Sequence, residues 1–182
     1  MGTDSLSRTR FVIRPGGGAS IADESVREAL GDLGAVVPLE GCEPGWLLTL
    51  KKASEAARPC PRVARRLDGA VAVVPVVEAS GDGPRYPTGL VNVRFREPVT
   101  DEELDAFGRA TRTAPVARST FSAKQVTLRV DAPADTYLPD AVRAIGRRDD
   151  VELAWLDTES SYTKAAAPRT PRAARKPPPR KE

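Results

Sequence analysis

The side chains that could carry acid–base chemistry in this chain are carboxylates, because none of its 182 residues is a histidine. Histidine is the usual general base of serine and cysteine hydrolases and the commonest neutral metal ligand. The carboxylates cluster at Asp101-Glu102-Glu103 and at Asp149-Asp150. The first cluster opens a predicted helix and the second lies in a predicted helix-to-strand turn, where capping and solvation explain acidic residues. We therefore predict that the protein is not an enzyme.

Two cysteines, Cys42 and Cys60, are the other candidates for chemistry. Two cysteines without a histidine do not make a zinc site of standard type, and we expect neither a metal nor a cofactor. The polar start of the sequence lacks the apolar segment of a secretory signal, so the expected location is the cytoplasm. In that reducing compartment we interpret the pair as free thiols, with a disulfide as the alternative. No apolar run is long enough for membrane insertion.

Positive charge is concentrated at the C-terminal end. The formal net charge is +3, but from Lys164 onward there are seven basic residues and one acidic residue, which leaves 21 basic and 24 acidic residues before it. The six basic residues that we assign to a basic tail are Arg169, Arg172, Arg175, Lys176, Arg180 and Lys181. This segment also holds five prolines and no apolar side chain larger than alanine. Its composition predicts a disordered or polyproline-like tail.

The elements that would position any site occur twice. A strand-helix-strand-strand-helix-strand pattern begins near Phe11 and begins again near Val91, and corresponding positions lie 78 to 80 residues apart. Asp23-Glu24 opens the first helix of one copy and Asp101-Glu102 opens that of the other. A period of this length indicates tandem small domains.

The predicted fold class is α+β, with two tandem ferredoxin-like (βαββαβ) sandwiches followed by the disordered basic tail. The predicted segments are a flexible leader over 1–9, a first ferredoxin-like domain over 10–80, a linker over 81–88, a second such domain over 89–163, and the tail over 164–182. The first copy is expected to have strands at 10–14, 35–39, 46–51 and 70–78 and helices at 23–33 and 61–67. The second is expected to have strands at 90–95, 116–119, 125–130 and 151–156 and helices at 100–110 and 139–146. Thr100 and Glu103 have the spacing of a capping box.

The second copy carries a family resemblance. It opens with GLVNVRFREPVTDEELDAF at Gly89 and closes with YLPDAVRAIGRRDDVELAWLDTESSY at Tyr137. The closing block supplies the matching residues Val142, Ile145, Asp150, Val151, Glu152 and Ala154. Residues 89–164 resemble the inhibitory propeptides of subtilisin-family serine proteases, most of all the fervidolysin-type prodomains, and residues 10–80 resemble them more loosely. Trp155-Leu156 replaces the usual Glu-Pro pair, and no protease domain follows.

The resemblance implies a non-enzymatic companion that inhibits, chaperones or docks a separately encoded subtilisin-like serine protease. Such prodomains lay their sheet on two surface helices of the protease, and the segment after the last strand enters the substrate cleft as an added strand. The cleft segment implied here comprises Ser160, Ser161, Tyr162, Thr163 and Lys164. Asp157 and Glu159 would cap the protease helices, although solvated strand-end charges are the alternative interpretation.

Two other functions remain open. The tandem domains could form a protein-interaction adaptor whose basic tail contacts nucleic acid or an acidic partner through its charge. They could also sense a small molecule in the manner of tandem ACT domains, which resemble this topology. An RNA-recognition surface is disfavoured, because the third strands of the two copies hold a single aromatic residue, Trp46.

Overall fold

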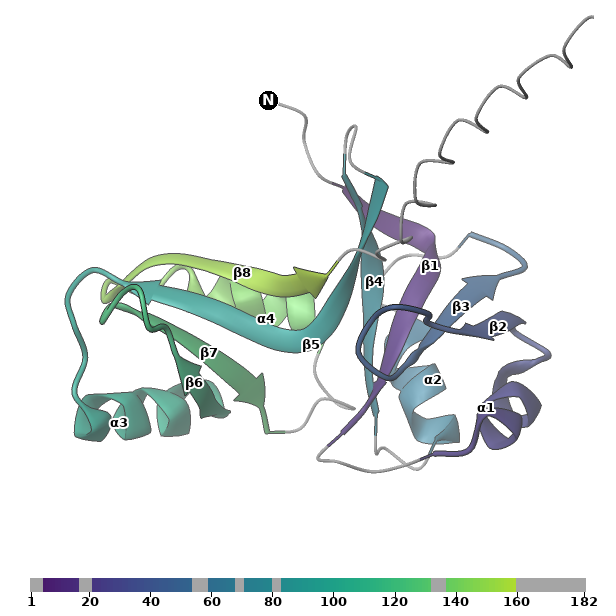
Figure 1. Ribbon diagram of the computed structural model, residues 1–182, viewed down its shortest axis with the longest axis horizontal. Coiled ribbons are helices and arrows are strands. Elements are labelled where there is room, and N and C mark those ends of the chain that lie inside the picture. Colours follow the sequence, from purple (N-terminus) through teal and green to yellow (C-terminus); the bar gives the residue numbers. More distant parts are fainter. Residues whose placement is uncertain are drawn as a thin grey trace, which may run out of the picture.

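The computed structural model describes residues 5–16, 21–53, 59–67, 71–79, 83–131 and 137–159. Within these ranges the chain is α+β, with four helices and an antiparallel sheet of eight strands (Figure 1). The predicted cleft segment and the predicted basic tail lie outside the described residues. None of the described helices has the length and apolar character needed to cross a membrane.

The two halves of the chain have the same order of elements. The first half contains β1 (Ser5–Pro15), α1 (Asp23–Leu30), β2 (Gly34–Pro38), β3 (Trp46–Leu50), α2 (Pro59–Arg66) and β4 (Val71–Ala79). The second half contains β5 (Gly83–Phe95), α3 (Asp101–Thr111), β6 (Thr113–Arg118), β7 (Gln125–Val130), α4 (Leu138–Ile145) and β8 (Val151–Glu159). Strands pair in the order β2-β3-β1-β4 in the first half and β6-β7-β5-β8 in the second. The strand order is therefore also the same in both halves.

A hairpin joins the halves into one sheet. The end of β4 pairs with the start of β5, from Val77 opposite Arg85 to Ala79 opposite Gly83. From Tyr86 onward that edge of β5 pairs with β8 instead. β5 thus changes partner between Arg85 and Tyr86. Its register with β8 then shifts between Pro87 and Val91, around Gly89, which has a φ of 89°. A single long strand thus belongs to both halves, as Figure 1 shows.

Two boundaries differ from those expected from composition. Residues 83–88, expected to be part of a linker, form the first part of β5, and residues 5–9, expected to be part of a leader, form the first part of β1. Proline, glycine and polar residues suggest irregular chain in both places. Residues 5–6 nonetheless pair with β4 and residues 86–87 pair with β8, which are distant in the sequence. Residues 83–85 pair with the end of β4 in a hairpin.

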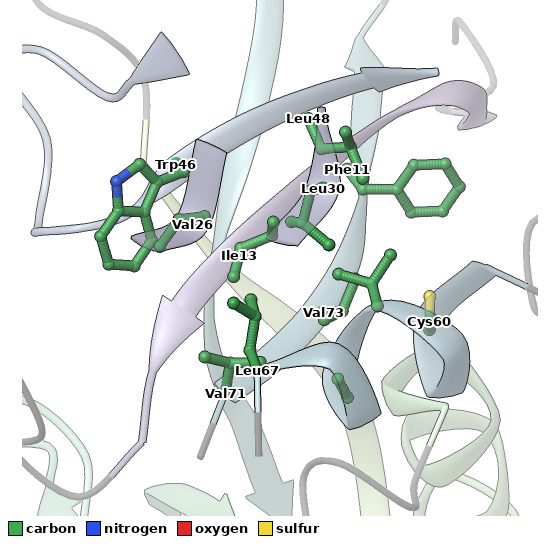
Figure 2. Close-up of a cluster of buried hydrophobic side chains, with 12 residues drawn as sticks. Phe11, Ile13, Val26, Leu30, Trp46, Leu48, Cys60, Leu67, Val71 and Val73 are labelled. Atoms are coloured by element: carbon green, nitrogen blue, oxygen red, sulfur yellow. The ribbon is translucent and has the colours of Figure 1, made fainter. Parts of the chain in front are cut away.

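Each half has its own apolar core on the helical side of the sheet. The first core brings together Phe11, Ile13, Val26, Leu30, Trp46, Leu48, Cys60, Val63, Ala64, Leu67, Val71 and Val73. Figure 2 shows these side chains between the sheet and helices α1 and α2. The second core brings together Val74, Val91, Val93, Phe95, Leu104, Phe107, Val126, Leu128, Val130, Leu138, Ile145 and Val151. Val74 of the first half belongs to the second core, so the cores meet at the junction.

Local sequence signals explain the helix that begins the second half most completely. The Thr100 hydroxyl accepts from the Glu103 backbone N–H, and the Glu103 carboxylate accepts from the Thr100 backbone N–H. This confirms the predicted capping box. These hydrogen bonds from Thr100 also lower the pKa of Glu103.

Gly34 directly follows the helix predicted over 23–33, a position typical of a glycine that ends a helix. The structure gives it a different role. Helix α1 ends at Leu30, with Gly31 as its cap, and Gly34 begins β2. A Cβ atom at Gly34 would lie 2.0 Å from the carbonyl oxygen of Thr49 on β3. The glycine is therefore required by the close approach of two strands.

We expect Gly34→Ala to destabilise the protein by roughly 2–4 kcal/mol, because β2 must move away from β3 to accommodate the methyl group. Urea denaturation followed by circular dichroism would measure the change. Gly146→Ala is the matched control, since its Cβ would lie 3.4 Å from the nearest atom and its φ is −66°. That variant should be about 0.4–1 kcal/mol more stable through the unfolded state. Equal destabilisation by the two substitutions would contradict this explanation.

Candidate functional site

On the helix-free face of the second half, exposed apolar side chains lie beside hydrogen-bonded polar side chains. On β5, Val91 and Val93 point into the core, so Asn92 and Arg94 point to the other face. The β8 residues opposite them are Trp155 and Leu153. We call this surface the open face and define it as Asn92, Arg94, Thr127, Arg129, Leu153, Trp155 and Asp157.

A chain of hydrogen bonds crosses the open face from β7 through β5 to β8. The Thr127 hydroxyl donates to the Asn92 side-chain oxygen at 2.7 Å, and the Asn92 amide donates to Asp157 Oδ1 at 2.9 Å. Asp157 Oδ2 accepts from the Thr88 hydroxyl at 2.7 Å. Asn92 is only 8% exposed. These hydrogen bonds hold each of the side chains in place, which fixes the shape of the face before any partner binds.

Beside these polar groups lie two large apolar side chains from β8. Leu153 is 54% exposed, and Trp155 is half-buried. Arg94, opposite Leu153, pairs with Glu152 at 3.1 Å, and both charges are about half exposed. Tryptophan and arginine are enriched in protein-binding surfaces, and both occur here beside Leu153 and hydrogen-bonded polar groups.

The equivalent face of the first half is covered. Val12 and Val76 point to that face and pack with Tyr86 from the start of β5. Leu39, Cys42 and Leu47 pack against this cluster. The helix-free face of the first half is therefore covered by the start of β5 and by the loop between β2 and β3. The corresponding face of the second half has no such cover.

Arg14 holds this covered face together. Its side chain is 4% exposed, and its Nε donates to the Pro87 carbonyl oxygen at 3.1 Å. The same guanidinium donates to the Glu43 carbonyl oxygen and forms an ion pair with Glu159, the last residue of β8. The Glu43 backbone N–H donates to both carboxylate oxygens of Glu159 at 3.1 Å. One arginine thus joins β1, the β2–β3 loop, β5 and β8.

The two carboxylates expected to cap helices of a partner have partners within the chain. Asp157 accepts from Thr88 and Asn92, and Glu159 accepts from Arg14 and Glu43. Asp157 lies on the open face, whereas Glu159 lies at the junction. Either residue would have to exchange these hydrogen bonds in order to cap a helix of another protein.

The remaining residues selected from the sequence fall into two groups. The cleft segment Ser160, Ser161, Tyr162, Thr163 and Lys164, and the basic tail residues, lie outside the described part of the chain. The carboxylate clusters have local roles: Asp101 pairs with Arg118 at 2.7 Å and Asp150 pairs with Arg148 at 3.0 Å. Among the described residues no group of three or more potential ligands could hold a metal ion.

Cys42 and Cys60 do not form a disulfide, and their surroundings differ. Cys60 is buried in α2, and burial raises its pKa to about 12. Tyr137, which precedes α4, packs against the first core, and burial beside Cys60 raises its pKa to about 12. Burial and the neighbouring Glu159 carboxylate also raise the pKa of Cys42. Both thiols are therefore protonated near neutral pH and poorly nucleophilic.

The sequence did not single out Arg14 or Asn92. Arg14 ends the run Phe11-Val12-Ile13-Arg14 and shares the face of Val12, a position that an isolated half would leave in solvent. The β2–β3 loop and the second half bury it together. For Asn92, alternation of side chains places the residue on the helix-free face, but its hydrogen-bond partners come from distant strands.

Comparison with known proteins gave no match. The chain matches no family model, no curated protein and no solved structure. The geometry of the open face and of the junction is therefore the basis for the functional argument.

We expect Arg14→Ala to destabilise the protein by roughly 3–5 kcal/mol, because Glu159 and the backbone acceptors would lose a buried cationic donor. Arg94→Ala is the control, since the Arg94–Glu152 pair is half exposed. Its loss should cost less than about 1 kcal/mol. Urea denaturation of both variants measures the difference, and similar small losses would show that the Arg14 contacts do not stabilise the junction.

Alkaline pH should destabilise the protein through Tyr137 and Cys60. Both pKa values are raised in the folded state, so the unfolded chain releases these protons at lower pH. The corresponding stability is fully present below about pH 8.5 and is lost as the pH rises toward 12. Urea denaturation between pH 8 and pH 11 would measure the loss. Tyr137→Phe should show a shallower decline, and an unchanged decline would exclude a contribution from Tyr137.

Proposed function

We propose that this protein is a non-enzymatic companion of a subtilisin-like serine protease and that the open face is its docking surface. The single observation that carries the proposal is the contrast between the two halves. One helix-free face is covered from within the chain, and the other presents Leu153 and Trp155 beside a preorganised chain of hydrogen bonds. Such a surface suits a protein partner.

We infer that the halves are tandem ferredoxin-like units. In support, each has the element order strand-helix-strand-strand-helix-strand and each places its last strand beside its first. In each unit the helical side of the sheet packs into an apolar core. Such folds serve many functions, so the choice of partner has to come from the surface and from the resemblance.

The resemblance to subtilisin-family propeptides supplies the class of partner. Several residues that carry it have roles in the fold: Ile145 and Val151 are buried in the second core, and Val142 and Ala154 pack against that core. Asp150 pairs with Arg148, and Glu152 pairs with Arg94. The resemblance therefore supports the architecture of the second half most directly. It supports a protease as the partner because such propeptides bind their protease through the same face of the sheet.

The docking geometry follows from the open face. Two helices of the protease would lie across β7, β5 and β8, where Leu153 and Trp155 would be buried on binding. The ordered side chains of Asn92 and Thr127 would remain in place, so little conformational entropy is lost. The chain then leaves β8 at Glu159, which is hydrogen-bonded to Glu43 of the first half. In this proposal the first half fixes the position of Glu159, from which the cleft segment continues.

The proposal is tested by titrating the full chain into a subtilisin-type protease and measuring residual activity. We expect inhibition that is lost when the chain ends at Ser161, because the truncated chain lacks most of the segment for the cleft. Leu153→Asp should raise the inhibition constant at least about tenfold, since a charge would be buried on docking.

Val37→Asp is the matched control, because Val37 is 50% exposed on β2 of the first half, away from the open face. It should inhibit as the unchanged protein does. Full protease activity at saturating concentrations of the chain would contradict the proposal. Capture of an acidic partner or a nucleic acid by the tail would then favour the adaptor.

A further inference from the structure

The first half has a surface hollow that plays no part in the proposed function. It has a volume of about 370 Å³ and lies between the start of α1 and the loop that joins β2 to β3. The apolar residues that line it are Pro15, Ile21, Pro38, Leu39, Pro44 and Trp46. We call it the proline-lined hollow.

Trp46 gives the hollow a fixed aromatic wall. The residue is only 5% exposed, and its indole N–H donates to Asp23 Oδ1 at 2.8 Å. Figure 2 shows the ring at the edge of the first core, with its nitrogen directed away from the other labelled side chains. Ring and proline surfaces held rigidly in this way suit the packing of an extended, proline-rich segment.

The rim of the hollow is acidic. Asp23 lines it, and Glu24, Glu40 and Glu43 adjoin lining residues in the sequence. These four acidic side chains are exposed, whereas the basic residue that adjoins the lining, Arg14, is buried and donates to the Glu43 carbonyl oxygen. The loop 39–45 contains no basic residue. Two other hollows in the described part of the chain, of about 300 and 290 Å³, are each lined by two carboxylates and one arginine. The described lining of the proline-lined hollow holds Asp23 and no basic residue, so a cationic ligand meets no like charge among these lining residues.

The chain itself contains a segment of matching chemistry. Residues 165–182 hold five prolines, three of them consecutive at 177–179, and six basic residues against one acidic residue. The described chain ends close to the hollow, at Glu159. Glu159 is hydrogen-bonded to the Glu43 backbone, and the next residue, Pro44, lines the hollow. The 18 residues from Glu159 to Pro177 could span about 55 Å when extended, so reach sets no limit.

We propose that residues 165–182 bind in the proline-lined hollow of their own chain. Prolines of the segment pack against Trp46 and the lining prolines, and its basic residues face Asp23, Glu40 and Glu43. The contact is intramolecular, because the segment is tethered beside the hollow and its effective concentration there is high. An anionic partner that binds the basic residues would displace the segment and uncover the hollow. This inference does not depend on the proposed protease.

Nuclear magnetic resonance tests the proposal by comparing the full chain with a chain that ends at Lys164. We expect the resonances of the Trp46 indole N–H and the Gly45 amide to differ between the two proteins. The indole N–H of Trp155, on the open face, should be the same in both and serves as an internal reference. A synthetic peptide of residues 165–182 should move the Trp46 and Gly45 signals of the shorter chain toward their positions in the full chain.

Charge variants of the full chain supply the matched control. Neutralising the rim with Glu40→Gln and Glu43→Gln should move the Trp46 and Gly45 signals toward those of the chain that ends at Lys164. Glu102→Gln and Asp105→Asn, two exposed acidic residues of α3, should leave them unchanged. High salt should mimic the rim variant. Identical Trp46 and Gly45 signals with and without residues 165–182 would overturn the proposal. A difference that grows with protein concentration would also overturn it, by showing binding between chains.

Discussion

The buried guanidinium of Arg14 is the interaction on which the arrangement of the two halves depends. A buried cation is tolerable only when several acceptors replace the water it has lost, and here backbone carbonyls and one carboxylate do so. These acceptors come from the β2–β3 loop and from both ends of the second half. Neither half alone contains the full set of acceptors, so burial of the arginine requires both halves to be in contact.

This junction gives two similar units different surfaces. In the first half, the side of the sheet that lacks helices is covered by Tyr86 and by the loop that contains Cys42. In the second half, Leu153 is exposed on the same side of the sheet and Trp155 is half-buried there. The two halves therefore differ in one respect: the helix-free face of the second half is exposed, whereas that of the first half is covered. The junction also sets the place from which the chain continues beyond β8.

Short-range signals in the sequence predicted the elements well, because their causes are local. The capping pair Thr100 and Glu103 marks the start of α3, and the alternation of Val126, Leu128 and Val130 marks β7 with its observed bounds. The extension of β1 and the pairing of residues 86–87 with β8 were not predictable, since both depend on strands remote in sequence. The burial of Arg14 was not predictable for the same reason. Of the candidate site, Asp157 was selected from the sequence, but its role within the hydrogen bonds of the open face was not.

The two outer strands of the sheet, β2 and β6, show how the edges of the sheet end. β6 carries Pro115, and its register with β7 shifts between Pro115 and Ala117, while β2 ends at Pro38. A proline has no N–H to offer a further strand, and a bulge turns the remaining donors out of line. A regular edge at each end would let the β2 of one molecule add to the β6 of the next, and repetition of that contact would build an open-ended filament. The prolines interrupt the regular row of backbone donors at these two edges, which disfavours such propagation through β2 and β6.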